Sequence, residues 1–164
     1  MPDKRHLLTL LLLLLAGPCR AAAADGAPLR GVDTVAIHIQ GLERDLETYG
    51  VTETSLKTAL EQRLAAAGIK VVKPGETERV PGSAVLTLRL TLNRTVFYFF
   101  LYNLHMAVQS RLPLARDPRA YTSITTWSDT KIGMLMPREL GKIRDLSLQQ
   151  TDEFLKVYRQ QNPR

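Results

Sequence analysis

The chain has 164 residues, a formal charge of +6 at pH 7 and a single cysteine. This length suits one domain behind a short leader, with a core large enough to need no disulfide framework. The mild basic excess contains no block of like charge, so we expect no nucleic acid partner. Anionic components such as phospholipid headgroups are the partners that this charge balance favours.

Residues 1–24 are typical of a secretory signal peptide. A basic start precedes the leucine-rich run Leu7–Ala16, which is shorter than the ~20 residues that a membrane-spanning helix needs. Small residues follow, and they predict cleavage after Ala24. We therefore expect residues 25–164 to form a single exported domain, either periplasmic or secreted.

Cys19 suggests an alternative, an outer-membrane lipoprotein anchored through a lipidated cysteine. A lipidated cysteine normally follows a small residue, and Pro18 fits that requirement poorly. If cleavage falls after Ala24, the exported domain contains no cysteine. Its stability then depends on packing, and thiol catalysis and thiolate metal sites are excluded.

The first elements after the leader are a strand, a helix and a second strand. Residues 32–42 alternate between apolar and polar types, as a half-buried strand does, and a charged connector follows at 43–50. Thr52 is a suitable helix cap, and Gly68 is suited to the left-handed turn that ends a helix. A leucine every fourth residue marks the buried stripe between them. Residues 69–73 predict a strand that is parallel to the first if the two are neighbours.

Three further strands are predicted at Leu86–Leu92, Tyr102–Leu112 and Tyr121–Trp127, joined by connections too short for crossovers. The connection Leu114–Arg119 is a basic loop. Pro137 suits the first turn of a terminal helix, in which Ser147 and Thr151 interrupt the apolar face and allow a kink with a restart near Ser147.

These elements predict an α+β fold, a two-layer α/β sandwich. Its sheet of about five strands is mixed but mostly antiparallel. Each long strand has one apolar face, so both helices should cover the same side. The opposite face of the sheet is expected to be polar, with His38, Gln40, Thr87, Arg89, Thr91, Asn103, His105 and Gln109.

In this layout the chain resembles the small sandwich domains that assist envelope assembly in Gram-negative bacteria, such as the lipopolysaccharide-assembly lipoproteins. The run Leu64–Val72 followed by Pro81–Leu90, and the later Thr125–Trp127, also resemble small families of exported bacterial proteins. The resemblance implies a role in the bacterial envelope.

No arrangement of residues predicts catalysis, a cofactor or a metal site. The exported part has two histidines, His38 and His105, both on the polar strand face. If their strands were adjacent, the pair would allow a small hydrolase or a metal-dependent enzyme, although a zinc site needs three or four ligands. Surface histidines are the simpler interpretation.

The aromatic segment Val96–Tyr102 is the most unusual feature, because hairpin turns favour Gly, Asn, Asp and Pro. Its rings either cover the end of the core or form a binding tip that contacts a partner or a membrane interface. The candidate interaction residues are Phe97, Tyr98 and Phe99 in this segment, together with Arg116 and Arg119 in the basic loop.

We therefore expect a non-catalytic accessory or binding domain of the envelope. Its expected partner is an envelope protein or an anionic envelope component, with peripheral membrane contact through the aromatic hairpin as one form of that interaction. The alternatives are the enzyme that uses His38 or His105, and a lipid-anchored assembly factor.

Overall fold

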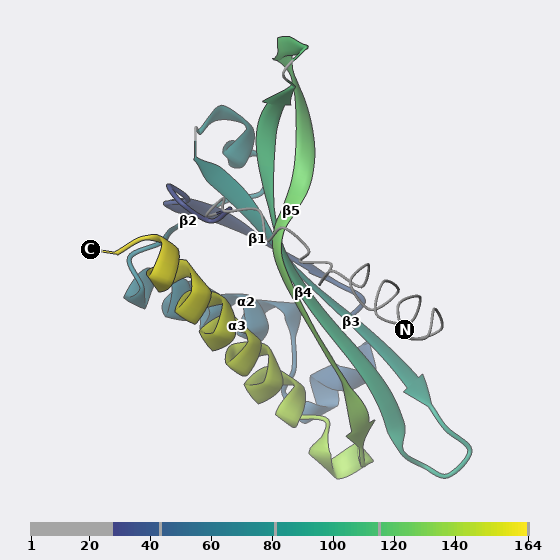
Figure 1. Cartoon of the computed structure of the whole chain (residues 1–164). Coiled ribbons are helices and arrows are strands. Elements are labelled where there is room, and N and C mark those ends of the chain that lie inside the picture. The colour runs from purple at the N-terminus through teal and green to yellow at the C-terminus, as the bar shows by residue number, and fades with distance from the viewer. Residues whose placement is uncertain (1–27, 43, 81, 115, 164) are drawn as a thin grey trace, which may run out of the picture.

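Five strands form one mixed sheet in the order β2-β1-β3-β4-β5 (Figure 1). The computed structural model describes residues 28–42, 44–80, 82–114 and 116–163. The leader, the cleavage site at Ala24 and Cys19 lie outside these ranges. The strands are β1 (Thr34–Gln40), β2 (Lys70–Val72), β3 (Ser83–Arg94), β4 (Phe100–Leu114) and β5 (Asp117–Leu135).

The pairing of the strands confirms both the parallel crossover and the antiparallel meander. β1 is parallel to β2 and to β3, and β3, β4 and β5 follow one another antiparallel. The helix that joins β1 to β2 makes the connection that a parallel pair requires. The expected mixed sheet and α+β class are therefore present.

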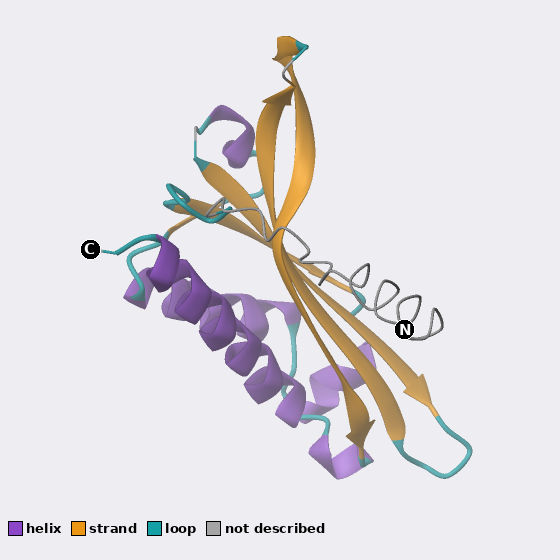
Figure 2. Ribbon diagram, viewed as in Figure 1, coloured by secondary structure: helices purple, strands orange, loops and turns teal. Residues whose placement is uncertain are grey.

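Two long helices, α2 (Glu53–Ala66) and α3 (Lys142–Gln161), cover one face of the sheet, as the sandwich prediction requires (Figure 2). Three short 3-10 helices add to them: η1 (Arg44–Tyr49), η2 (Glu76–Arg79) and η3 (Pro137–Glu139). The connector expected at 43–50 therefore contains helical turns. Pro137 begins η3 rather than the terminal helix, which starts at Lys142.

Both ends of α2 follow from local sequence. Thr52 Oγ1 accepts a hydrogen bond from the Ser55 N–H at 3.0 Å, and Ser55 Oγ accepts one from the Thr52 N–H at 3.0 Å. This reciprocal capping box satisfies donors that the first turn leaves free. At the other end Gly68 has φ 78, and the Ile69 N–H donates to the Leu64 carbonyl at 3.0 Å. A glycine that ends a helix in this conformation leads the chain directly into β2.

The core lies between the sheet and the helices. Alternate residues of β1, β3 and β4 meet the apolar stripes of α2 and α3 there. Phe154 of α3 is fully buried, and its ring centroid lies 5.4 Å from that of Trp127 on β5. Trp127 therefore packs against the terminal helix. The largest fully buried side chains also include Leu56, Leu60, Leu64, Leu86, Leu88, Leu104 and Met106.

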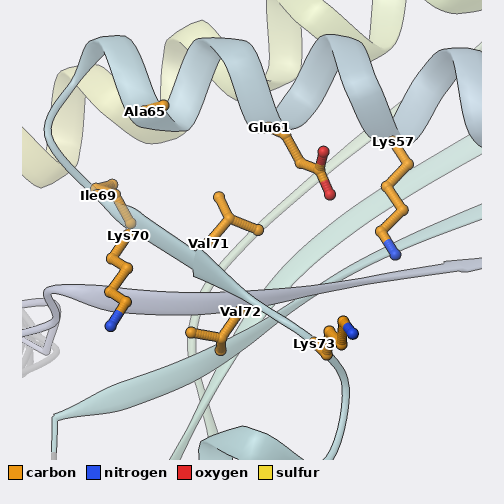
Figure 3. Close-up of a pocket in the computed structure, with 8 residues that line it drawn as sticks. All are labelled: Lys57, Glu61, Ala65, Ile69, Lys70, Val71, Val72 and Lys73. Atoms are coloured by element: carbon orange, nitrogen blue, oxygen red, sulfur yellow. The ribbon is translucent and has the colours of Figure 1, made fainter.

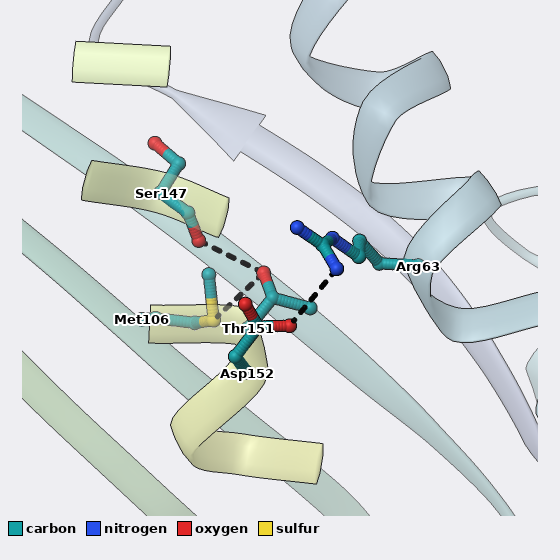
Figure 4. A network of polar contacts seen from close by, with 5 residues as sticks. All are labelled: Arg63, Met106, Ser147, Thr151 and Asp152. Atoms are coloured by element: carbon teal, nitrogen blue, oxygen red, sulfur yellow. Dashed lines mark hydrogen bonds and ion pairs between the residues drawn. The ribbon is translucent and has the colours of Figure 1, made fainter. Parts of the chain in front are cut away.

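The middle of α3 carries a row of buried polar residues instead of the kink that its sequence allows. Ser147 Oγ donates to the Ile143 carbonyl at 2.8 Å. Thr151 Oγ1 donates to the Ser147 carbonyl at 2.9 Å (Figure 4). These bonds to the preceding turn satisfy the hydroxyl groups within the helix. The helix itself runs without a break from Lys142 to Gln161. Beside them Arg63 of α2 pairs with Asp152 at 3.6 Å and joins the two helices.

β5 is much longer than the predicted strand Tyr121–Trp127. It starts at Asp117, directly after the turn residue Arg116, so Arg119 belongs to a strand and not to a loop. A register shift opposite Val108 and Gln109 marks a bulge at Thr126. Past that point the β4–β5 hairpin extends beyond β3, whose pairing with β4 reaches only Ser110 (Figure 1).

Candidate functional site

The connection between β3 and β4 closes tightly and carries aromatic residues at its end. The Thr95 N–H donates to the Phe99 carbonyl at 2.9 Å, Thr95 Oγ1 donates to the same oxygen at 3.0 Å, and the Tyr98 N–H donates to the Thr95 carbonyl at 3.3 Å. These bonds hold the three residues between Thr95 and Phe99 outside the ladder. They form the end of the hairpin farthest from β2 (Figure 1).

The aromatic segment divides between the two interpretations that its sequence allows. Val96, Phe97 and Tyr98 are 86%, 76% and 71% exposed. Phe100 and Tyr102 instead pack against the core cluster. The rings therefore cover the end of the core only from β4 onward, and the turn before it presents apolar side chains to solvent.

Tyr98 adopts φ 63, the left-handed region that side chains other than glycine rarely occupy. Its ring lies beneath the guanidinium of Arg94, whose Cζ is 5.8 Å from the ring centroid. A residue in this conformation after a short turn is common in hairpin loops, but glycine usually occupies it. A tyrosine held there carries a conformational cost and presents a large amphipathic ring at the end of the molecule.

The hairpin end meets the start of η3 in an open apolar groove of about 460 Å³, lined by Phe97, Tyr98, Met136, Pro137 and Arg138. We call the four exposed residues Val96, Phe97, Tyr98 and Met136 the apolar tip. Exposed contiguous apolar residues of this kind mark interaction sites in soluble proteins.

The charges around the apolar tip are basic. Arg94 and Arg138 flank it, and the nearby carboxylate of Glu139 is paired. Lys142 Nζ donates to Glu139 Oε1 at 2.7 Å, and the Met136 N–H donates to Oε2 at 3.0 Å. These bonds hold the pKa of Glu139 below its ordinary value. The carboxylate thus stays ionised and pairs with Lys142, and within the described part of the chain neither Arg94 nor Arg138 forms an ion pair.

Apolar residues continue from the tip onto the sheet face that the helices do not cover. Leu101 pairs with Met134 and Asn103 with Ile132, and all three apolar members are exposed, Ile132 by 73%. The expectation of a wholly polar face is therefore wrong at this end. The strand predicted at Tyr121–Trp127 ends too early to include Ile132 and Met134, although the alternation of Ile132, Met134 and Met136 is a usable signal.

The middle of the same face is polar, as expected. Gln40 Oε1 accepts hydrogen bonds from Arg89 Nη2 at 2.9 Å and Nε at 3.1 Å, and Gln40 Nε2 lies 3.3 Å from His38 Nδ1. His105 Nδ1 lies 2.8 Å from Thr130 Oγ1, on the other side of Arg89. These contacts form two polar groups, one between β1 and β3 and one between β4 and β5, which lie next to each other and make a polar band.

The structure does not bring His38 and His105 together. β3 lies between their strands, and the partner of His105 on β3 is Arg89, whereas the partner of His38 is Thr87. Two strand spacings separate the backbones by about 10 Å. Within the described part of the chain, no group of three or more His, Cys, Asp or Glu side chains could hold a metal ion.

The two candidate arginines lie at the end of the sheet opposite the apolar tip. Arg116 occupies the exposed turn between β4 and β5, and Arg119 lies early in β5. They therefore do not form one surface with Phe97, Tyr98 and Phe99. Among the helices that the structure describes, none is long and apolar enough to cross a bilayer.

Comparisons with known proteins give distant likenesses of fold. No protein-family model matches the sequence, and no curated protein matches it. A PelC dodecamer from Paraburkholderia phytofirmans is 16% identical, with a TM-score of 0.45 over 76% of this chain and 90% of that one. A structure described as a minor lipoprotein from Acinetobacter baumannii is 14% identical, with a TM-score of 0.33 over 76% of this chain and 94% of that one. Nothing about activity or partners follows from values this low.

Proposed function

We propose that the protein is an exported, non-catalytic accessory domain of the bacterial envelope that attaches to an anionic membrane surface through its apolar tip. The observation that carries this proposal is the run of three exposed residues, Val96, Phe97 and Tyr98, between Arg94 and Arg138. The signal-peptide pattern of residues 1–24 supports an exported location.

The chemistry of the tip suits the boundary of a bilayer. Val96 and Phe97 offer purely apolar side chains, while Tyr98 combines an apolar ring with a hydroxyl group, a combination enriched at membrane interfaces. Arginines beside such a tip are attracted to anionic headgroups, each contributing about 1 kcal/mol near the surface. A protein partner would need an acidic pocket that is complementary in shape to the tip. A membrane needs only an apolar interior beneath a negatively charged surface.

The attachment depends on two independent contributions that variants can separate. Phe97→Ser with Tyr98→Ser removes the apolar part, and Arg94→Gln with Arg138→Gln removes the charge. Tyr121→Ser is a matched control, because Tyr121 is also exposed and also lies beneath an arginine, with Arg111 Cζ 5.2 Å from its ring centroid. It lies on β5, in the hairpin arm at the far end of the sheet.

Cosedimentation with vesicles of phosphatidylglycerol and phosphatidylethanolamine tests the proposal. The tip variant should bind more than about tenfold more weakly, since burial of each aromatic ring is worth more than 1 kcal/mol. The arginine variant should lose affinity and most of its dependence on salt. Equal loss in Tyr121→Ser, or no binding by the unaltered protein, would refute the membrane proposal and leave an envelope protein as the partner.

A lipid anchor on Cys19 remains an alternative form of attachment. The intact mass of the exported protein distinguishes the two forms. Cleavage after Ala24 gives an unmodified chain that starts at Asp25, whereas an anchor gives a diacylated Cys19.

A further inference from the structure

A second groove lies at the opposite end of the sheet, where α2 passes over the edge strand β2 (Figure 3). Its volume is about 370 Å³, and its lining comes from α2 and from the segment that contains β2: Lys57, Glu61, Ala65, Ile69, Lys70, Val71, Val72 and Lys73. β2 pairs with the start of β1, which lies opposite the start of β3. β3 then runs from Ser83 to Arg94 at the base of the apolar tip, so the two surfaces are separated by roughly 35 Å. The groove is thus a separate surface.

The groove has an aliphatic floor and a basic rim. Ile69 is buried, and Val71 and Val72 are half-buried. The lining contains three lysines, Lys57, Lys70 and Lys73, and a single carboxylate, that of Glu61. Among the described residues none of these lysines forms an ion pair, so the rim keeps a net positive charge. An anionic ligand with apolar parts complements this surface.

The backbone of β2 forms an open edge of the sheet beside the groove. β2 is the last strand of the sheet, and its pairing with β1 is parallel. The Lys70 N–H donates to the Asp33 carbonyl at 2.9 Å, so Lys70 and Val72 direct their backbone groups toward β1. Alternation in a parallel ladder then turns the N–H and C=O of Val71 outward, to the open edge. An edge of this kind accepts a further strand.

The side chains at the edge alternate between the two faces of the sheet. Val71 points toward α2, where Glu61 and Lys57 reach down from the helix, and Lys70 points away from the helix (Figure 3). A strand added beside Val71 would therefore place aliphatic side chains against Val71 and Ala65. Its acidic side chains would lie beside Lys70 on the other face.

We propose that this groove binds an extended acidic segment of a partner protein, in which aliphatic and acidic residues alternate, by addition of a strand to β2. The segment gains main-chain hydrogen bonds to Val71, aliphatic contacts on the helix side and neutralisation of Lys70 on the other face. This site is independent of the membrane proposal. Together the two surfaces would give the domain a membrane contact at one end and a protein contact at the other.

The test uses a short capped peptide in which glutamate and valine alternate, with a lysine–valine peptide of the same length as the comparison. Fluorescence anisotropy of the labelled peptides measures their affinity for the purified protein. The glutamate peptide should bind, more weakly as salt rises, and the lysine peptide should not. Equal binding of both peptides, or binding of neither, would overturn the proposal.

Two variants separate charge from strand addition. Lys70→Glu should weaken binding of the glutamate peptide about fivefold, because the exposed charge changes sign. Val71→Pro should also weaken it about fivefold, because proline removes the outward N–H while the ladder with β1 keeps its bonds. Lys156→Glu is the control, since Lys156 is exposed on α3, and it should leave binding unchanged.

Each remaining outcome has a defined meaning. If Lys70→Glu has no effect, the groove is not the binding site and the proposal fails. Binding of the peptide could instead be weakened by Lys70→Glu alone and not by Val71→Pro, with inorganic phosphate competing fully. The site would then bind anions without strand addition, which also contradicts the proposal. Sedimentation velocity without peptide shows whether a second copy of the chain occupies the edge instead, an outcome that would replace the acidic segment.

Discussion

Arg94 holds its guanidinium over the ring of Tyr98, 5.8 Å from the ring centroid, while Tyr98 itself occupies the left-handed conformation with φ 63. The cation thus lies beside an exposed aromatic ring at the end of the β3–β4 hairpin. Cation–π contacts at such exposed sites contribute about 0.5–1 kcal/mol, which is comparable to the cost of the left-handed backbone. The conformation of Tyr98 is therefore not explained by a large gain in stability.

Tyr98→Gly should separate folding from binding. Glycine adopts a positive φ without the clash of a Cβ atom, so the free energy of unfolding should stay unchanged or rise by up to ~1 kcal/mol. Vesicle binding should fall at the same time because the ring is lost. Urea unfolding together with cosedimentation measures both quantities, and a variant that is clearly less stable would show that Tyr98 supports the fold.

Phe154→Ala should lower the free energy of unfolding by about 3–5 kcal/mol, because it empties a fully buried site. The ring of Phe154 contacts both Trp127 and Tyr158, with centroids 5.4 and 6.0 Å away. Trp127 is the one tryptophan of the chain, so its fluorescence reports on unfolding directly.

The control for this variant is Phe97→Ala, which removes the same side chain from the exposed tip. It should change the free energy of unfolding by no more than about 0.5 kcal/mol. A similar loss in both variants would mean that the tip is part of the core.

Gly133→Ala should destabilise the protein by about 1–3 kcal/mol through overpacking. Gly133 lies opposite Tyr102 in the β4–β5 ladder, and a Cβ atom added there would lie 2.8 Å from Cε1 and Oη of that ring. In a Tyr102→Ala background the same substitution should cost much less, since the two positions are coupled. Equal costs in the two backgrounds would contradict the contact.

Glu139 should make stability depend on pH in the acid range. Its pKa is lower in the folded chain than in the unfolded one, chiefly because of the hydrogen bond from Lys142. The carboxylate therefore contributes stability that is complete above the unfolded pKa and is lost as the pH falls through the folded pKa. An NMR titration of the Glu139 carboxyl carbon should show this lowered pKa, and Lys142→Gln should raise it. An unchanged pKa in that variant would disprove the role of Lys142.

The order of the elements along the chain and the antiparallel meander of β3, β4 and β5 could be predicted, because their signals are local. The place of β1 between β2 and β3 could not, because no local pattern identifies the neighbours of a strand. Thr52, Gly68 and the leucine stripe between them predict α2, and strict alternation predicts β3 and the inner part of β4. Once β1, α2 and β2 are recognised, the handedness of crossovers allows few arrangements. Two helices on one face then follow from strands with a single apolar side.

The extent of β5 and the nature of the tip could not be predicted from local patterns. The bulge at Thr126 reverses the alternation of the strand, so residues on its two sides follow different phases and the pattern breaks at Trp127. As long as the position of the turn is unknown, a run of aromatic residues is equally compatible with burial in the core and with exposure at the turn. The positive φ of Tyr98 could not be predicted either, because a tyrosine, unlike a glycine, does not indicate that conformation in a sequence.

Nitroxide-labelled lipid headgroups test the membrane contact most directly, because they broaden the NMR signals of protein atoms that approach the bilayer. With anionic vesicles, broadening should be confined to the amides of Val96, Phe97 and Tyr98 and the adjoining residues near Met136. Broadening centred on the polar band around Arg89, on the arm around Tyr121 or on the β2 groove, with the apolar tip unaffected, would contradict the proposed attachment.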